Sequence, residues 1–139
     1  MNNKFEQISL KSGFMKHNGG VLFKTISENE YEFKTIINEN HLNAAGITHG
    51  GFIAALVDAG AGTAAHRSSD GNPCVTISLE LKFISPVQLG QELIGKTKIQ
   101  KKTKSMIFLT CELTVKNKIA ATASGVWKIL KLSGAGPGG

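Results

Sequence analysis

Cysteine is scarce in this sequence. Cys74 and Cys111 are the only two cysteines, they lie far apart, and neither belongs to a Cys-x-x-Cys pair. The four histidines form no His-x-x-x-His pair of the kind that binds zinc on one face of a helix. These absences favour two reduced, partly buried thiols over a disulfide, and we expect no metal site.

Long apolar runs are also missing. No stretch approaches the ~18 apolar residues of a membrane span, and residues 1–7 lack the basic-then-apolar pattern of a signal peptide. We therefore expect a cytoplasmic protein with no membrane partner. With 139 residues, 41% of them hydrophobic, the chain is long enough for one soluble domain with a real core. We place that domain at residues 1–132 and interpret residues 133–139 as a flexible glycine-rich tail or a remnant of cloning.

Arginine and tryptophan are rare in a chain that is nevertheless basic. The formal net charge is +6, yet Arg67 is the only arginine and Trp127 the only tryptophan. The basic excess lies in residues 71–139, which hold ten lysines and three acidic residues. A one-sided basic surface attracts polyanions, but no run of interleaved basic and aromatic residues resembles an RNA-binding module. We expect no nucleic-acid partner, and a small polyphosphate ligand or plain solubility fits the charge as well.

The N-terminal third predicts one helix and a hairpin. Apolar residues in 3–16 recur at loosely helical spacing, which predicts a short amphipathic helix that ends near Gly13. Residues 21–26 and 31–36 are apolar and β-branched segments separated by a polar turn, and they predict two strands of a β-hairpin.

Residues 50–66 predict a central helix. Almost all of its side chains are small or apolar, so we expect no solvent face and complete burial. Its glycines and alanines at 59–62 and 64–65 predict a close approach by another backbone. Four strands are then expected at 74–84, 92–100, 106–115 and 119–131. Two strands, a buried helix and four strands predict an α+β fold, with an antiparallel sheet curled around one helix.

The polar loop before this helix carries the clearest chemical signal. It holds Asn43 and His49 and runs through Gly50 and Gly51 into the helix. N–H groups at a helix start have no intrahelical partner and lie at the positive end of the dipole, so they can hold a developing oxyanion. Asp58 is the one carboxylate in the apolar helix, and a buried carboxylate is costly unless it is paired or functional. Together these features predict chemistry at a carbonyl group.

Each of these residues also has a purely structural interpretation. Asp58 can be satisfied by hydrogen bonds across a subunit interface, and Asn43 can stabilise an Asx turn in its own loop. Gly50 and Gly51 allow a sharp turn into the helix. A histidine at a helix start, such as His49, often only packs and hydrogen-bonds.

A longer set of residues carries a family resemblance. It comprises His41, Asn43, Gly46, His49-Gly50-Gly51, Leu56 and Asp58, and downstream Phe83, Pro86, Gly90, Leu93 and Lys104-Ser105. This pattern resembles the phenylacetate-pathway (PaaI-like) branch of the hotdog-fold acyl-CoA thioesterases over roughly residues 20–130. The resemblance implies a hotdog fold, a homo-oligomer, and hydrolysis of an acyl-CoA by water without a metal or cofactor.

The resemblance also implies roles for individual residues. The Gly50 N–H polarises the thioester carbonyl, while Asn43 and His49 position the acyl-thioester group. Asp58 acts as general base or as nucleophile. Thr76 stands where relatives can carry a serine that orients water, so a hydroxyl is kept with an added methyl group.

Substrate-binding residues follow from the same resemblance. Gly51 borders the thioester, and Lys102, Lys104 and Ser105 meet the phosphates of coenzyme A. Relatives often have glycine where Thr103 stands, so the turn and its phosphate contacts can differ from those of the family. A solvated turn is the simpler interpretation of these lysines.

The predicted function is therefore acyl-CoA hydrolysis to free acid and CoA. Two alternatives stay open: a hotdog module that binds an acyl-CoA without cleaving it, and a hotdog hydratase or dehydratase, which generally pairs a histidine with an acid in a different helix context. The acyl group is undetermined among arylacetyl, hydroxybenzoyl and medium-chain groups.

The spacing within the helix predicts a shared site. If Gly50 opens the helix, Asp58 lies about 12 Å further along its axis at 1.5 Å per residue, too far for both to reach one carbonyl. Two such helices lying antiparallel across a two-fold axis remove this difficulty. We expect Asn43 and Gly50 from one chain and Asp58 and Thr76 from the other, in a homodimer or in a homotetramer built as a dimer of dimers.

Overall fold

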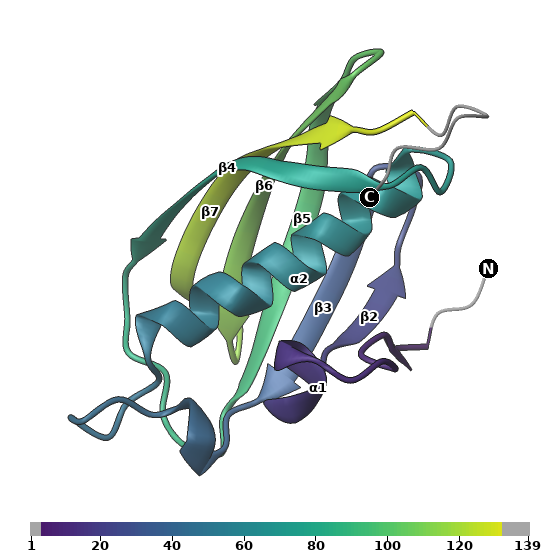
Figure 1. Cartoon of the computed structure of the whole chain (residues 1–139). Coiled ribbons are helices and arrows are strands. Elements are labelled where there is room, and N and C mark those ends of the chain that lie inside the picture. Colours follow the sequence, from purple (N-terminus) through teal and green to yellow (C-terminus); the bar gives the residue numbers. More distant parts are fainter. Residues whose placement is uncertain (1–3, 132–139) are drawn as a thin grey trace.

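A single antiparallel sheet wraps around one long helix (Figure 1). The structure is a computed structural model that describes residues 4–131, so the tail expected at 133–139 lies outside the described residues. The sheet has seven strands in the order β1-β2-β3-β5-β6-β7-β4. The strands and helices run in chain order β1 (Glu6–Gln7), α1 (Phe14–His17), β2 (Leu22–Thr25), β3 (Glu30–Ile36), η1 (Glu39–His41), α2 (Gly50–Ser68), β4 (Cys74–Phe83), β5 (Glu92–Lys102), β6 (Met106–Val115) and β7 (Lys118–Ile129). The predicted α+β fold is confirmed.

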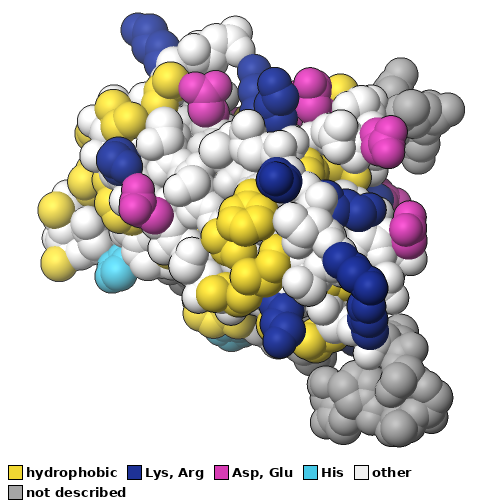
Figure 2. Space-filling view, turned by 90° about the horizontal axis from the view of Figure 1, so that it is seen from above, with side chains coloured by type: hydrophobic (Ala, Val, Ile, Leu, Met, Phe, Trp, Pro, Cys, Tyr) yellow, Lys and Arg dark blue, Asp and Glu magenta, His cyan; other side chains and the backbone are white. Residues whose placement is uncertain are grey.

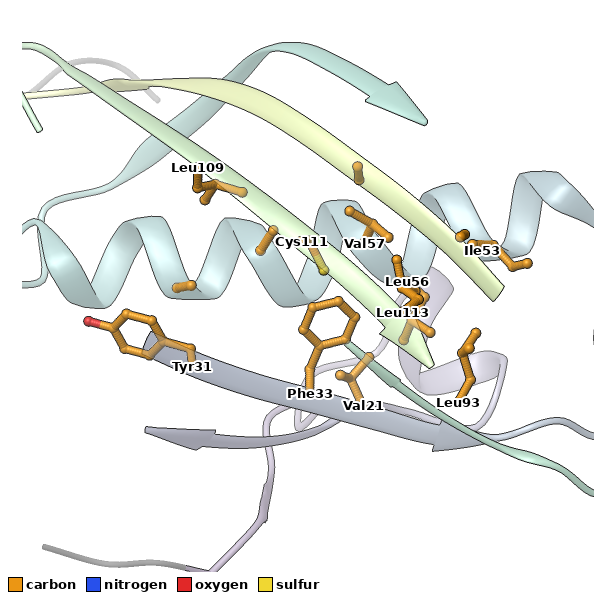
Figure 3. Close-up of a cluster of buried hydrophobic side chains, with 14 of the residues drawn as sticks. Val21, Tyr31, Phe33, Ile53, Leu56, Val57, Leu93, Leu109, Cys111 and Leu113 are labelled. Carbon is orange, nitrogen blue, oxygen red and sulfur yellow. The ribbon is translucent and has the colours of Figure 1, made fainter. Parts of the chain in front are cut away.

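The strands follow the apolar alternation of the sequence. β2 and β3 form the predicted hairpin, with Phe23 opposite Phe33. Buried and exposed residues alternate along β5, β6 and β7, so one face of each strand packs against α2 and the other faces outward. Figure 3 shows the resulting core between helix and sheet, in which the labelled side chains are Val21, Tyr31, Phe33, Ile53, Leu56, Val57, Leu93, Leu109, Cys111 and Leu113.

One aromatic ring accounts for two of the glycines. A Cβ added to Gly60 on α2 or to Gly95 on β5 would collide with the ring of Phe33, which is fully buried. The predicted close approach by another backbone is wrong at Gly60, where a phenyl ring makes the contact instead. Any side chain larger than hydrogen at these two positions would displace the ring from the core.

The helix predicted over residues 3–16 is wrong. Residues 6–7 form β1, which pairs with β2, and α1 starts after Gly13 where the predicted helix was to end. The Gln7 and Ser9 side chains both accept hydrogen bonds from the Val21 N–H, each at 3.1 Å. The free edge of β2 therefore sets the conformation of this segment, because it supplies partners for the backbone hydrogen bonds. The local spacing of apolar residues does not reveal such a partner, since β2 lies later in the sequence.

The expectation that α2 is buried on all sides is also wrong for a single chain. Phe52 and Leu56 are buried toward the sheet, but Gly51 and Asp58 are exposed and Ala55 is only partly covered. The helix therefore has one open side lined by glycine, alanine and the carboxylate.

The strand beside that open side is an edge strand. β4 lies at one end of the sheet, and its Val75 and Ile77 are 44% and 52% exposed. Figure 2 looks down on the molecule from above the view of Figure 1 and shows exposed apolar side chains gathered among lysine and arginine side chains. An exposed edge strand with apolar side chains is typical of a surface that binds another protein chain.

Candidate functional site

The start of α2 leaves one backbone N–H unpaired. His49 is the N-cap, and its Nδ1 accepts a hydrogen bond from the Gly51 N–H at 2.7 Å. The N–H groups of Phe52 and Ile53 donate to the His49 carbonyl at 3.0 and 3.3 Å. Within residues 4–131 the Gly50 N–H has no hydrogen-bond acceptor. It lies at the positive end of a helix of 19 residues, where a partial negative charge is stabilised.

A buried histidine holds the loop against the helix. The His41 ring is buried and stacks on Phe52 with centroids 3.7 Å apart, and its Nδ1 accepts from the Asn38 N–H at 3.0 Å. The His41 carbonyl accepts from the His49 N–H at 2.8 Å. Thr48 is also buried, and its hydroxyl donates to the Val87 carbonyl at 2.7 Å. The residues before Gly50 are therefore fixed before any ligand binds.

The Asn43 side chain stabilises a turn in its own loop, as its structural interpretation predicts. Its Oδ1 accepts hydrogen bonds from the N–H groups of Ala45 at 2.9 Å and Ile47 at 3.3 Å. This arrangement is an Asx-type turn. The Nδ2 amide has no acceptor within the described residues, so the side chain keeps a donor available while its oxygen shapes the loop.

Asp58 is exposed and paired with a hydroxyl. Thr76 Oγ1 on β4 donates to Asp58 Oδ1 at 2.7 Å. The expectation of a buried carboxylate is wrong for one chain, because the open side of α2 leaves Asp58 in contact with solvent. A register shift between Thr76 and Ser78 interrupts the pairing of β4 with β7. Bulges of this kind redirect side chains next to functional sites, and here Thr76 points toward the helix.

The structure does not bring Gly50 and Asp58 together in one chain. Both belong to the same uninterrupted helix, so about 12 Å separates them along its axis at 1.5 Å per residue. Thr76 contacts Asp58, whereas His49 caps the helix at Gly50 and Asn43 lies in the loop that leads to it. Within one chain the candidate site residues therefore fall into two separate groups, which we call half-sites.

The lysine turn between β5 and β6 lies apart from both half-sites. Lys102 Nζ donates to the Ser68 carbonyl at 2.6 Å and so caps the C-terminus of α2. The Ser105 carbonyl accepts from the Ile129 N–H at 2.8 Å, while Lys104 is exposed at the turn. Lys102 also lines a cavity of about 590 Å³ together with Arg67 and other polar residues. Of the predicted phosphate ligands, Lys102 already has a structural partner.

Phe83 lies beside the helix start, although no role in the site was predicted for it from the sequence. Its ring lies against Gly50, because a Cβ on that glycine would stand 3.2 Å from the ring. In the register of β4 with β7, Phe83 pairs with Ala121. The apolar alternation of residues 74–84 gave its inward direction, but no local signal gave its contact with a residue 33 positions earlier.

No metal cluster is found in the part of the chain that the structure describes: residues 4–131 contain no group of three or more His, Cys, Asp and Glu side chains able to hold an ion. Over the same residues no helix is both long and apolar enough to cross a membrane. Both cysteines are free thiols. Burial raises the pKa of the Cys111 thiol to about 12, so this side chain belongs to the core.

The architecture and the helix-start site define a hotdog protein, and solved thioesterases share the fold. A zebrafish thioesterase superfamily member 2 superposes with a TM-score of 0.78 at 22% identity, covering 88% of this chain and 90% of that one. The Escherichia coli PaaI protein of the phenylacetic acid degradation operon superposes with a TM-score of 0.74 at 18% identity, covering 80% of each chain.

Sequence similarity then gives the family. The thioesterase superfamily matches residues 45–120. A provisionally named esterase of Pseudomonas aeruginosa is 34% identical over 94 residues, which are 67% of this chain and 70% of that protein. Acyl-coenzyme A thioesterase 13 of Mus musculus is 32% identical over 89 residues, 64% of each protein. The chain belongs to the thioesterase superfamily, and its class is that of the thioester hydrolases.

Proposed function

We propose that the chain is an acyl-CoA thioesterase, which hydrolyses an acyl-CoA to the free acid and CoA. The observation that carries the proposal is the exposed Asp58 carboxylate, held through one oxygen by Thr76, on the helix whose first N–H is unpaired. The similarity to a mouse acyl-coenzyme A thioesterase supports CoA as the carrier of the acyl group.

The two half-sites have complementary chemistry. The Gly50 N–H donates a hydrogen bond to the carbonyl oxygen as it becomes an oxyanion. Asp58 takes a proton from water, the water oxygen bonds to the carbonyl carbon, and the carbon–sulfur bond then breaks to release the thiolate, which is protonated to CoA. In the other route Asp58 itself attacks and forms a mixed anhydride that water hydrolyses. Thr76 holds the carboxylate in place in both.

The label from heavy-oxygen water separates these routes. In a single turnover with enzyme in excess, label in Asp58 supports the nucleophile, and label only in the product acid supports the base. Peptide mass spectrometry around Asp58 reads the first outcome, and mass analysis of the acid reads the second.

A dimer would join the half-sites. We place Asn43 and Gly50 from one chain beside Asp58 and Thr76 from its partner, with the helices antiparallel across a two-fold axis. The open side of α2, formed by small residues, and the exposed apolar side chains of the β4 edge support this arrangement. A dimer of such dimers is the larger assembly we expect.

We assign binding of the CoA phosphates to Lys104 and Ser105 at the turn after β5. Lys104 is exposed, and the formal net charge of +6 favours an anionic substrate. Lys102 contributes positive charge nearby while it caps α2. Gly51 and His49 act at the helix start, where the imidazole fixes the first turn.

The test is CoA release measured with a thiol reagent over a panel of acyl-CoA thioesters. Wild-type turnover that is lost in Asp58→Asn supports the proposal. Tight binding without release of CoA would instead indicate an acyl-CoA-binding module. A panel that contains phenylacetyl, hydroxybenzoyl and medium-chain thioesters identifies the acyl group from the ratio of kcat/KM values.

A further inference from the structure

Phe83 is a large apolar side chain that contacts the start of α2 and is otherwise largely exposed in the single chain. It is the last residue of β4, and its ring lies over the first residue of α2: a Cβ on Gly50 would stand 3.2 Å from Cζ and 3.4 Å from Cε1. The opposite position on β7 is the buried Ala121, whose methyl group leaves space for a ring. Even so, Phe83 is 57% exposed.

The contact explains why residue 50 is a glycine. Gly50 begins a regular helix, and its φ is not among the positive ones, so the backbone conformation accepts any residue. A Cβ at 3.2 Å from an aromatic carbon would push the ring outward by a few tenths of an ångström. Glycine therefore lets the tip of the ring lie against the helix start, next to the Gly50 N–H.

We infer that the Phe83 ring is the wall of the acyl-thioester site beside the Gly50 N–H, and that it selects acyl groups with apolar carbons next to the carbonyl. This inference rests on the proposed thioesterase function. A carbonyl oxygen that accepts from the Gly50 N–H carries its acyl group alongside the exposed ring. Hexanoyl or phenylacetyl carbons gain from that contact, acetyl offers only a methyl group, and the carboxylate of succinyl would lose hydration against the ring.

The same wall excludes water from one side of the N–H. An N–H donor is a stronger oxyanion partner where water is displaced from around it. Phe83 is in this sense a positioning and specificity-determining residue, and the chemical step stays with Asp58.

The experiment compares kcat/KM for hexanoyl-, phenylacetyl-, acetyl- and succinyl-CoA in the wild type, Phe83→Ala and Phe83→Leu. Burial of one CH₂ group is a factor of about four in an equilibrium constant. Hexanoyl has four more CH₂ groups than acetyl, and loss of the ring contact with two of them predicts that Phe83→Ala lowers kcat/KM for hexanoyl-CoA roughly fifteenfold more than for acetyl-CoA. Phe83→Leu should retain part of the preference. Phe108→Leu is the matched control, because Phe108 alternates with the buried Ile107 and Leu109 and so lies on the outer face of the sheet.

Two results overturn the inference: an equal loss for all four thioesters in Phe83→Ala, or no loss for any. If the wild-type chain releases CoA from none of them, the proposed function fails, and the wall is then tested by the Kd values of the same four compounds. The contact itself has a readout apart from activity. Gly50→Ala should change Tm less favourably in the wild type than in the Phe83→Ala background, where the added methyl group meets no ring, and equal changes would contradict the packing.

Discussion

The shared site makes a quantitative prediction for mixed subunits. Asn43→Ala removes a residue of the Gly50 half-site, and Asp58→Asn removes the carboxylate of the other half-site. Each variant alone has the same lesion in every site of its dimer. A dimer of one subunit of each kind has one site with both lesions and one site with none.

The expected recovery follows from random pairing. Equal amounts of the two variants give mixed dimers in about half of the population, and one of the two sites in each mixed dimer is intact. Activity should therefore rise from the level of the separate variants to about one quarter of wild type. The physical basis of this recovery is the separation of Gly50 and Asp58, which lie roughly 12 Å apart along the axis of their own helix. Within one chain, one carbonyl group cannot contact both residues.

The assay is CoA release before and after reversible dissociation and reassociation of the mixture. Native mass spectrometry measures the fraction of mixed dimers, and a mixture of wild type with itself gives the loss due to handling. Exchange to about half mixed dimers without any gain in activity would refute the shared site, since a site contained in one chain leaves every subunit of the mixture defective.

Three further predictions follow from single side chains. Asp58→Asn should lower kcat at least about a hundredfold, as for the loss of a general base, with unchanged Tm because asparagine keeps the size of the side chain and an oxygen that accepts from Thr76; near-normal turnover would remove Asp58 from the mechanism. Lys104→Ala should raise KM for a CoA thioester and leave KM for the matching pantetheine thioester unchanged, and equal effects would exclude a phosphate contact. Thr97→Val should raise the free energy of unfolding by about 1 kcal/mol, because Thr97 Oγ1 is buried and has no hydrogen-bond partner of good geometry within residues 4–131. Its interaction with the facing Cys111 thiol, which offsets part of the rise in the pKa of that thiol on burial, is weak. Urea unfolding of the wild type and Thr97→Val measures this difference, and a destabilised variant would show that the hydroxyl is satisfied.

Local patterns predicted most of the fold because they depend on periodicity. The apolar alternation of β5, β6 and β7 and the mostly small and apolar residues of α2 each define an element within about twenty positions. The prediction for the segment before β2 was wrong. Residues 6–7 pair with β2, and the spacing of apolar residues within 3–16 carries no information about a strand that lies later in the chain. Loosely helical spacing over a few residues is a weak signal when a free sheet edge is within reach.

The half-sites were predictable in content but not in arrangement. The sequence by itself determined that a polar loop meets a helix start at His49-Gly50-Gly51, that one carboxylate interrupts the helix, and that the two lie too far apart to act from one chain. Only the tertiary structure decided that the Thr76 hydroxyl donates to Asp58, that the Asn43 oxygen accepts from its own loop, and that Phe83 contacts Gly50. The contacts of Thr76 with Asp58 and of Phe83 with Gly50 join residues 18 and 33 positions apart, and they depend on how β4 packs against α2. The contact within the Asn43 loop depends on hydrogen-bond geometry. Composition and periodicity set the elements, whereas the packing of a sheet edge against a helix sets the chemistry between them.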